Sequence, residues 1–308
     1  EYGQLSGNTL DALRSGAGGR VEEGTQRIKR HPADFMLWKP DPRHLMKWNS
    51  PWGEGYPGWH LECSVMAMDI LGAATHGVID IHSGGEDLIF PHHECEIAQV
   101  CGATDESRFA RYWFHTRFLI VEGSKMSKSA GNFFTLRDLL AKGASPASIR
   151  LELIKTHYRS QANFTMQGLR DAQRQVERWV RLRDWLVEHE NEPMPFAPPG
   201  PLASALKVFK ESLCDDLNIA AAIGALNEAA NQYQRSETAA SGNGSGETYS
   251  GELLALQQMD SVLGVLDLER EAVEEAVDVD ADEIEGLIKQ RNEARANKDF
   301  AEADRIRD

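Results

Sequence analysis

Residues of the types that bind metal ions lie in two short stretches, GWHLECS, which contains Cys63, and PHHECE, residues 91–96. His92 and Glu96 are four residues apart, so on a helix they share one face, a common way of presenting two metal ligands. Cys63, on another predicted helix, could supply a third ligand. Cys95 lies near the same face, so spacing alone does not choose between Cys95 and Glu96. Taken alone, PHHECE is equally typical of a structural histidine pair at a helix start.

A second chemical signal is the pentapeptide KMSKS, Lys125 to Ser129, in a polar stretch bounded by apolar runs. Two ammonium groups beside glycines, on a loop after a strand, could stabilise the charge that develops as pyrophosphate leaves a nucleotide. The alternative interpretation is a solvated basic turn. The motif therefore predicts a phosphate-binding loop that uses Lys125 and Lys128.

The elements that must position these residues alternate between helix and strand. Residues 58–72 follow Pro57 with apolar residues at helical spacing. A glycine pair, Gly84 and Gly85, opens a loop, and Pro91 suits the first turn of a helix that ends at Gly102. Strand, helix and strand in this order predict an α/β parallel sheet whose ligands bind at the carboxyl ends of its strands. The predicted helix face is Trp59, Cys63, Met66 and Ile70, the buried strand is Val78, Ile79 and Ile81, and the next strand is 112–121.

After about residue 145 the pattern becomes helical. Ser145-Pro146 starts one helix, and Thr165 caps a long one with an apolar stripe from Leu169 to Leu186. Two or three further helices are predicted, at about 202–214, 218–236 and 252–266. Residues 267–283 are acidic and predict a solvated linker. Two capping boxes, Asp280 with Glu283 and Asp299 with Glu302, predict two short terminal helices.

Composition limits the possible classes of function. The 308 residues are 41% hydrophobic and carry a net charge of −15, which argues against a general nucleic-acid coat. A local basic face is still possible on the long helix, because several of its arginines step by four, four and three residues. There is no run of eighteen apolar residues and no signal peptide, and four cysteines form no disulfide framework, so a cytoplasmic protein without a membrane span is expected. The arginines are Arg170, Arg174, Arg178, Arg181 and, beside them, Arg183.

Four long motifs resemble the cysteinyl-tRNA synthetases, which are class I aminoacyl-tRNA synthetases. They are GWHLECS, DIHSGGEDLIFPHHECEIAQ, KMSKSAGNFFT and THYRSQANF, and the tail IEGLIKQRNEARANKDFAEADRIRD also resembles that family's C-terminal segment. The resemblance implies an enzyme that ligates cysteine to tRNA(Cys) through a cysteinyl-adenylate, with ATP and Mg²⁺. It also implies one Zn²⁺ per subunit, selecting the substrate thiolate, and a monomer.

The resemblance assigns roles to individual residues. It selects Glu96 over Cys95 as a zinc ligand, beside Cys63 and His92. The family's fourth ligand, a Cys, and its HIGH motif lie in the first half of the nucleotide-binding fold, which this sequence does not contain, so a fragment that is inactive alone is expected. Lys125 and Lys128 are implied at the phosphates with Ser127 and Ser129, and Trp59, His82 and Asp87 at the bound cysteine, Asp87 facing its ammonium group.

The resemblance also divides the chain. Residues 1–47 would end a connective insertion, 48–120 form the second half of a Rossmann-like catalytic domain, and 121–145 carry the KMSKS loop and a stem-contact region. Residues 146–270 would form a helical anticodon-binding bundle, and 271–308 an acidic linker with a small C-terminal domain. Two alternatives are a cysteine ligase of mycothiol biosynthesis, which uses an amino-sugar acceptor and lacks the matching tail, and a non-catalytic paralogue that binds tRNA or zinc.

Overall fold

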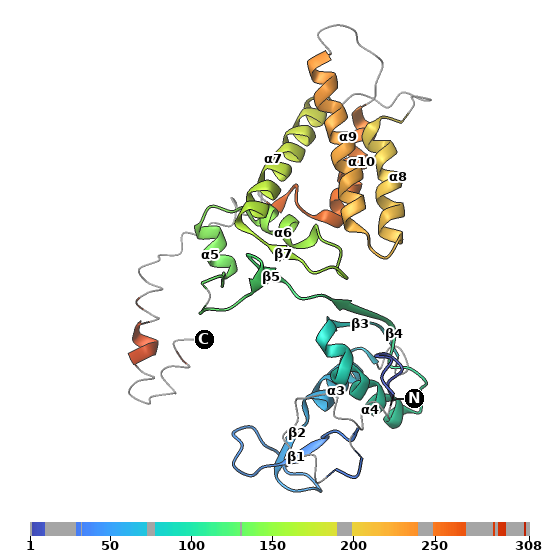
Figure 1. Ribbon diagram of the computed structural model, residues 1–308, viewed down its shortest axis with the longest axis vertical. Helices are drawn as coiled ribbons and strands as arrows, with labels where there is room; N and C mark the ends of the chain where they lie inside the picture. The colour runs from blue at the N-terminus through green and yellow to red at the C-terminus, as the bar shows by residue number, and fades with distance from the viewer. Residues whose placement is uncertain are drawn as a thin grey trace. The chain divides into compact units, whose positions relative to one another are not determined.

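The computed structural model describes residues 2–9, 29–31, 33–72, 78–129, 131–189, 199–239 and 249–268, with 286, 289–293 and 305 (Figure 1). The chain divides into two compact units, described separately: residues 1–120 with 157–163, and residues 121–156 with 164–308. The predicted acidic linker beyond residue 268, both capping boxes and nearly all of the predicted domain 271–308 lie outside the described residues. No helix among the described residues is long and apolar enough to cross a membrane.

The first unit is built on two parallel strands, β3 (Ile79–Gly85) and β4 (Ala110–Thr116), with Ile79 opposite Ala110 and Gly85 opposite Thr116. Parallel strands need a crossover connection. Here it consists of a 3-10 turn, Glu86–Leu88, and a π-helical turn kinked at Phe90, Ile89–His93, followed by α4 (Glu94–Thr104). Helix α3 (Trp59–Ile70) packs against α4, and Ile79, Val100, Phe109 and Ala110 form the core. A short antiparallel pair, β1 (Trp38–Pro40) and β2 (Gly55–Pro57), precedes α3.

Several local predictions for this unit need correction. The strand predicted over 112–121 is two strands, β4 and, after a three-residue break, β5 (Ile120–Val121). The helix predicted from Pro91 begins as an α-helix only at Glu94. Ile81, predicted as part of a buried strand, is 64% exposed. Helix α3 forms where the helical spacing predicts it, and most of its shared apolar face is exposed. The exposed α3 residues are Trp59, Met66 and Ile70.

The second unit begins with a small sheet in the order β6-β5-β7, in which β6 is Ser124–Lys125 and β7 is Asn163–Phe164. The boundary between the units falls within β5 and β7. Two helices lie between β6 and β7 in sequence, α5 (Leu136–Ala141) and α6 (Pro146–Ile154). Helices α5, α6 and α7 (Met166–Glu188) each begin at a hydroxyl residue whose oxygen accepts a backbone N–H of the first turn, which explains where they start. The caps are Thr135, Ser145 and Thr165.

A helical bundle makes up most of the remaining described residues of the second unit (Figure 1). It comprises α7 (Met166–Glu188), α8 (Pro201–Cys214), α9 (Ile219–Ala239) and α10 (Tyr249–Leu263). The apolar stripe of α7, which includes Trp179, is buried against residues of the other three helices, among them Phe209 of α8 and Met259 of α10. An α/β part followed by an all-α part is the predicted fold class, and it is confirmed.

The predicted arginine stripe on α7 is broken. Arg178 is turned toward α9 and donates hydrogen bonds to Asn227 and Asn231, and Arg183 donates to the backbone oxygen of Leu266. Both guanidinium groups therefore join elements of the bundle. The exposed remainder of the stripe is Arg170, Arg174 and Arg181.

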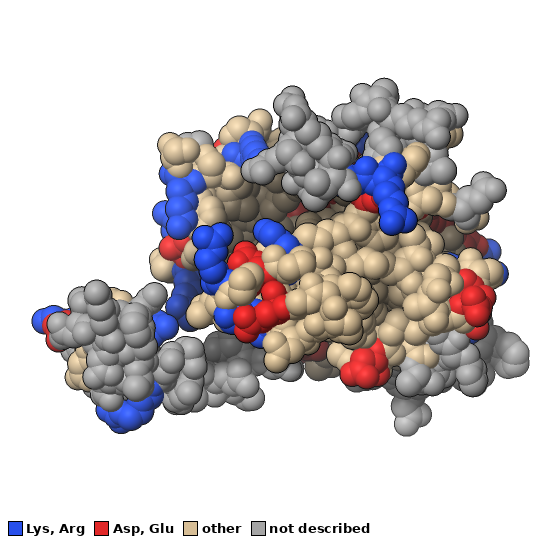
Figure 2. Space-filling view, turned by 90° about the horizontal axis from the view of Figure 1, so that it is seen from below, with Lys and Arg blue, Asp and Glu red and all other residues tan. Residues whose placement is uncertain are grey.

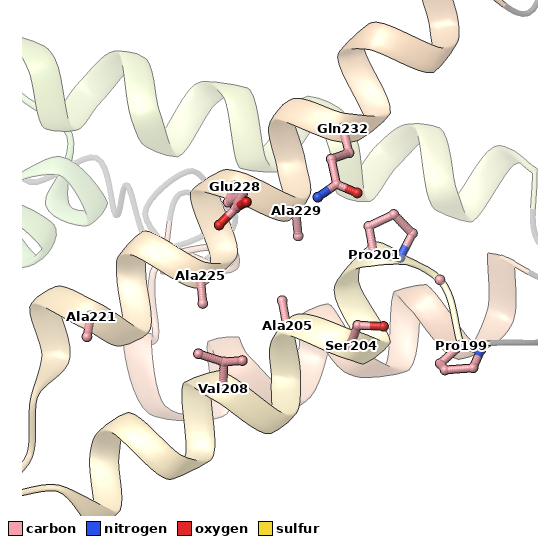
Figure 3. Close-up of a pocket in the computed structure, with 11 residues that line it drawn as sticks. Pro199, Pro201, Ser204, Ala205, Val208, Ala221, Ala225, Glu228, Ala229 and Gln232 are labelled. Carbon is pink, nitrogen blue, oxygen red and sulfur yellow. The ribbon is translucent and has the colours of Figure 1, made fainter.

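A groove of about 580 Å³ runs between α8 and α9 (Figure 3). Small side chains of α9, Ala221, Ala225 and Ala229, face Ser204 and Val208 of α8 across it. The hollow is the direct result of these small residues, since larger side chains would fill the space between the helices.

Candidate metal centre

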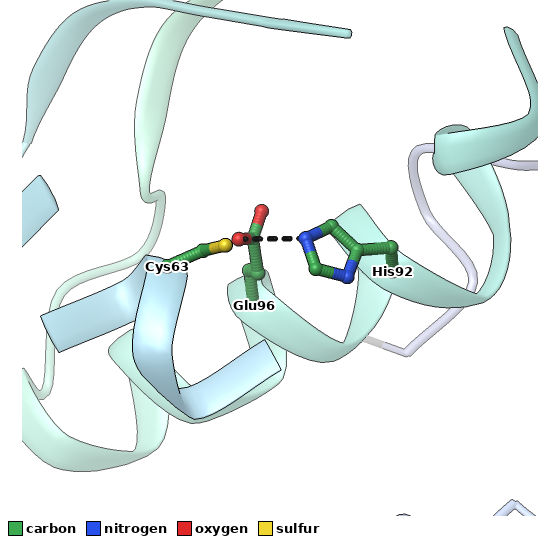
Figure 4. Close-up of side chains that lie close together, drawn as sticks. All are labelled: Cys63, His92 and Glu96. Carbon is green, nitrogen blue, oxygen red and sulfur yellow. Dashed lines mark ion pairs between the residues drawn. The ribbon is translucent and has the colours of Figure 1, made fainter. Parts of the chain in front are cut away.

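Three potential metal ligands from three parts of the chain converge in the first unit (Figure 4). Cys63 comes from α3, His92 from the turn before α4, and Glu96 from α4. One ligand atom from each lies within 4.8 Å of the other two. His92 and Glu96 are neighbours because they are four residues apart, with His92 Nε2 3.3 Å from Glu96 Oε1, and the packing of α3 on α4 brings Cys63 to them.

Glu96 has a buried oxygen that fits a cation. The side chain is fully buried, and Oε1 accepts no hydrogen bond from any described residue. Its 3.3 Å approach to His92 Nε2 is an ion-pair distance that lacks hydrogen-bond geometry. A buried carboxylate oxygen without a partner costs about 1–3 kcal/mol or more. A positive ion between Oε1, Nε2 and the thiol would offset that cost, so the donor set fits a metal.

The ligand atoms that face away from the centre of the group already lie within hydrogen-bond distance of other histidines. Glu96 Oε2 is 2.8 Å from His82 Nε2, and His92 Nδ1 is 2.7 Å from His60 Nδ1. Partners of this kind orient metal ligands and fix which ring nitrogen is available. The arrangement leaves Glu96 Oε1 and His92 Nε2 directed toward the centre of the group.

Burial controls the protonation of the site. Desolvation lowers the pKa of His92 below its usual value, although Glu96 acts in the opposite direction. Burial lowers the pKa of His93 to about 3, with His82 adding to the effect. Burial raises the pKa of the Cys63 thiol, and the negative charge of Glu96 raises it further. The imidazoles are therefore neutral, as ligands must be, whereas a metal would have to displace the proton of Cys63.

A wider histidine network surrounds this group and was not predicted from the sequence. His82, His93 and Glu96 also place one ligand atom each within 4.8 Å, and His93 Nδ1 is 2.7 Å from His115 Nε2. His93 is 1% exposed. The signal that could have found it is the concentration of six of the ten histidines in the predicted α/β part, residues 48–120: His60, His76, His82, His92, His93 and His115.

The other sequence-predicted residues of this unit lie as follows. The ring centres of Trp59 and His92 are 4.2 Å apart, so this half-exposed indole forms one side of the potential metal site. Asp87 is in the 3-10 turn that directly follows β3. Cys95, which spacing left as an alternative ligand, lies 3.4 Å from the Tyr2 hydroxyl and outside the converging group.

The KMSKS residues belong to the second unit. Lys125 ends β6, and Lys128 is exposed with its Nζ 5.5 Å from the centre of the Phe133 ring. The hydroxyls of Ser127 and Ser129 are 3.3 Å apart. Both lysine side chains are exposed and hence accessible to a phosphate group.

Asn132 organises this loop and was missed by the sequence analysis. It is 7% exposed, and its Nδ2 donates to the Val121 and Lys125 carbonyls and to Ser124 Oγ. Its Oδ1 accepts the backbone N–H of Ser127. One side chain thus ties both ends of the turn together. A short polar residue beside Gly131 in an otherwise solvated stretch was the available signal.

Comparisons with known proteins agree with this architecture. The family model of the tRNA synthetases class I (C) catalytic domain matches residues 1–174, and that of the DALR domain matches residues 208–267. A cysteine–tRNA ligase of Ruegeria sp. (strain TM1040) is 42% identical over 99% of this chain and 59% of its own length. One of Pseudomonas aeruginosa (strain LESB58) is 43% identical over all of this chain and 62% of its own length. The chain therefore spans about 60% of the curated relatives that it matches.

A solved structure supports the fold alone. It is the crystal structure of the ternary complex of Agrobacterium radiobacter K84 agnB2 LeuRS-tRNA-LeuAMS, with a TM-score of 0.50 and 16% identity. The match covers 72% of this chain and 32% of the other. Because the catalytic-domain model matches more than half of the chain and relatives share over 40% of its residues, the chain belongs to the cysteinyl-tRNA synthetase family of class I aminoacyl-tRNA synthetases.

Proposed function

We propose that this chain takes part in the ATP-dependent ligation of cysteine to tRNA(Cys) through a cysteinyl-adenylate. The observation that carries the proposal is the convergence of a thiol, an imidazole and a buried carboxylate oxygen without a hydrogen-bond partner at Cys63, His92 and Glu96. The relatives that match the chain are cysteine–tRNA ligases, which favours a tRNA acceptor over an amino sugar.

Cys63, His92 and Glu96 would hold a zinc ion, since mixed sulfur, nitrogen and oxygen ligands suit that metal. When bound, zinc supplies a borderline-soft Lewis acid that prefers the thiolate of cysteine to the hydroxyl of serine. An apolar pocket discriminates poorly between side chains of such similar size. Trp59 would close one side of the substrate site, and His82 would keep Glu96 in place.

Asp87 would receive the ammonium group of the substrate. Its carboxylate directly follows the end of β3, and ligands of open α/β sheets bind beyond the carboxyl ends of the strands. A charge-assisted hydrogen bond from an ammonium group would orient the substrate carboxylate for reaction. This role is separate from selection of the substrate side chain. An Asp87 variant should therefore lose affinity for cysteine and for serine alike.

Activation needs positioning and charge stabilisation. The cysteine carboxylate attacks the α-phosphate of ATP, pyrophosphate leaves with the bonding electron pair, and Mg²⁺ accompanies the phosphates. Lys125 and Lys128 would stabilise the negative charge on the leaving group. The loop would open for ATP and close for reaction, with the Ser127 and Ser129 hydroxyls supporting the closed form.

The acceptor would be recognised elsewhere on the chain. The bundle of α7 to α10 overlaps the DALR-domain match and would bind the anticodon arm of tRNA(Cys). The exposed arginines Arg170, Arg174 and Arg181 on α7 are the candidates for phosphate contacts. We propose a cytoplasmic monomer for the complete enzyme.

Selective binding of cysteine tests the proposal directly. The chain is loaded with Co²⁺, whose thiolate charge-transfer absorption reports sulfur ligands, and is titrated with cysteine and with serine. Cysteine should intensify the absorption, serine should not, and Cys63→Ala should remove the signal of the protein thiolate. Equal responses to the two amino acids would contradict thiolate selection. In a complete enzyme, Lys128→Ala should slow ATP–pyrophosphate exchange strongly while metal binding stays unchanged.

A further inference from the structure

Glu94 is a buried acid on the side of α4 opposite the metal ligands. It lies two residues from both His92 and Glu96, which is about 200° around a helix with 3.6 residues per turn. Its side chain is 1% exposed. It cannot touch the metal group, and the proposed function gives it no role, yet a carboxylate in such a position needs compensating hydrogen bonds.

Those hydrogen bonds come from the segment 2–9. The backbone N–H of Gly3 donates to Glu94 Oε2 at 2.9 Å, and that of Ser6 donates to Oε1 at 2.6 Å. The segment is closed on itself by a hydrogen bond from the N–H of Gly7 to the Gly3 oxygen. Gly3 has φ +94°, and a Cβ there would lie 1.8 Å from the Asn8 oxygen, so the loop requires glycine at this position.

A second line of contacts runs from the same segment to the metal group. The Tyr2 ring stacks on Phe35 with centres 6.4 Å apart, and Phe35 meets the edge of His60 at 5.9 Å. His60 in turn holds Nδ1 of His92. The segment therefore contacts the first turn of α4 through Glu94 and approaches a ligand through two aromatic rings.

We propose that Glu94 is a positioning residue for the metal ligands and that residues 2–9 act as a brace for the start of α4. The inference rests on the proposed metal centre. Two charge-assisted hydrogen bonds on one face of the first turn fix the rotation of the helix, and that rotation sets where His92 and Glu96 point. Losing the brace would let the ligands turn away from Cys63, so metal affinity would fall.

The test measures Co²⁺ binding to the chain by its absorption spectrum, without any activity assay. Glu94→Gln removes the charge and places an amide NH₂ against a backbone N–H. Gly3→Ala disrupts the brace without altering α4. Asp69→Asn, at an exposed position on α3, is the matched control for charge. Glu94→Gln and Gly3→Ala should each weaken Co²⁺ binding about tenfold or more, the usual effect of removing a partner that orients ligands. They should also alter the d–d bands that report coordination geometry, and the control should do neither.

The outcomes separate the inference from the function on which it rests. A wild-type chain that binds no Co²⁺ overturns the metal centre and this inference with it. If the wild type binds and Glu94→Gln binds equally well with an unchanged spectrum, the inference alone is wrong, even when the variant melts at a lower temperature. If Glu94→Gln does not fold, Gly3→Ala decides, and wild-type affinity and spectrum in that variant overturn the brace.

Discussion

At the scale of single residues, the two carboxylate oxygens of Glu96 differ in their surroundings. Its Oε2 is held by His82, whereas its buried Oε1 has no hydrogen-bond partner among the described residues. Sites that store such a cost commonly give up stability for function. The spacing of His92 and Glu96 could be predicted from the sequence because helix geometry is periodic. The partners His60 and His82 could not, since they depend on how strands and helices pack.

Glu96→Gln should therefore separate metal binding from stability. The neutral amide offers a weaker ligand, so we expect Co²⁺ affinity to fall by more than the roughly 10-fold minimum seen when only a partner of a ligand is removed. Without metal, the variant should be as stable as the wild type or more stable by about 1 kcal/mol, because its NH₂ group can donate to His92 Nε2 and no charge is buried. Urea unfolding of both metal-free proteins measures the difference. A metal-free variant clearly less stable than the wild type would show that Oε1 has a partner of its own.

His93 makes the first unit sensitive to acid. Burial lowers its pKa in the folded state to about 3, whereas the unfolded value is about 6.5. Between these values the unfolded chain binds a proton that the folded chain does not, so stability is full above about pH 6.5 and is lost as the pH falls toward 3. His93→Asn should show a smaller loss of urea resistance between pH 7 and pH 5. The exposed His44→Gln serves as the control and should keep the wild-type slope.

At the scale of elements, the KMSKS loop depends on one side chain. The four hydrogen bonds of Asn132 join β5, β6 and Ser127, and without them the turn is held mainly by Met126, which packs against the small core around Val121. The sequence could predict that this loop is polar and carries phosphate-binding lysines. It could not predict that Asn132 faces inward, since polarity alone indicates exposure.

Asn132→Ala should make the loop open more often. Loss of about 1.4 kcal/mol of local stability corresponds to a tenfold larger open population. Trypsin should then cleave after Lys125 and Lys128 about tenfold faster than in the wild type. Cleavage after Lys142, at the end of α5, provides the internal control and should be unchanged. Equal cleavage rates at Lys125 and Lys128 in the two proteins would mean that Asn132 does not control the loop.

Helix starts were predicted more accurately than buried faces. Ser145 and Thr165 begin α6 and α7 as expected, because capping is a local interaction between a side chain and the next turn. Ile81, predicted as buried in its strand, is exposed instead, and so are Met66 and Ile70 on the predicted apolar face of α3. Periodicity shows that one face is apolar but does not show what covers it, and Arg178 illustrates the reverse case, a charged residue whose partners lie on another helix.

At the scale of the whole molecule, the two units have separate hydrophobic cores. The core of the first unit surrounds Ile79 and Phe109, and the largest core of the second surrounds Trp179. The net charge is −15, but the surface is not uniformly acidic. The face drawn in Figure 2 carries Lys and Arg as well as Asp and Glu, together with a broad uncharged area. Because each core is formed within one unit, we expect each unit to have its own stability.

Metal should therefore stabilise one unit and leave the other unchanged. A ligand that binds only the folded state adds about 2.7 kcal/mol when its free concentration is 100 times its dissociation constant. With Zn²⁺, hydrogen exchange measured by mass spectrometry should slow in peptides from α3, β3 and α4, which carry or adjoin Cys63, His92 and Glu96. Exchange in α7 to α10 should not change, because their core contains no ligand of the metal. The Cys63→Ala chain should show no slowing in either unit at the same Zn²⁺ concentration. Equal slowing in α4 and α8 of the wild type would show that the two units unfold together and that the separate cores do not define separate stabilities.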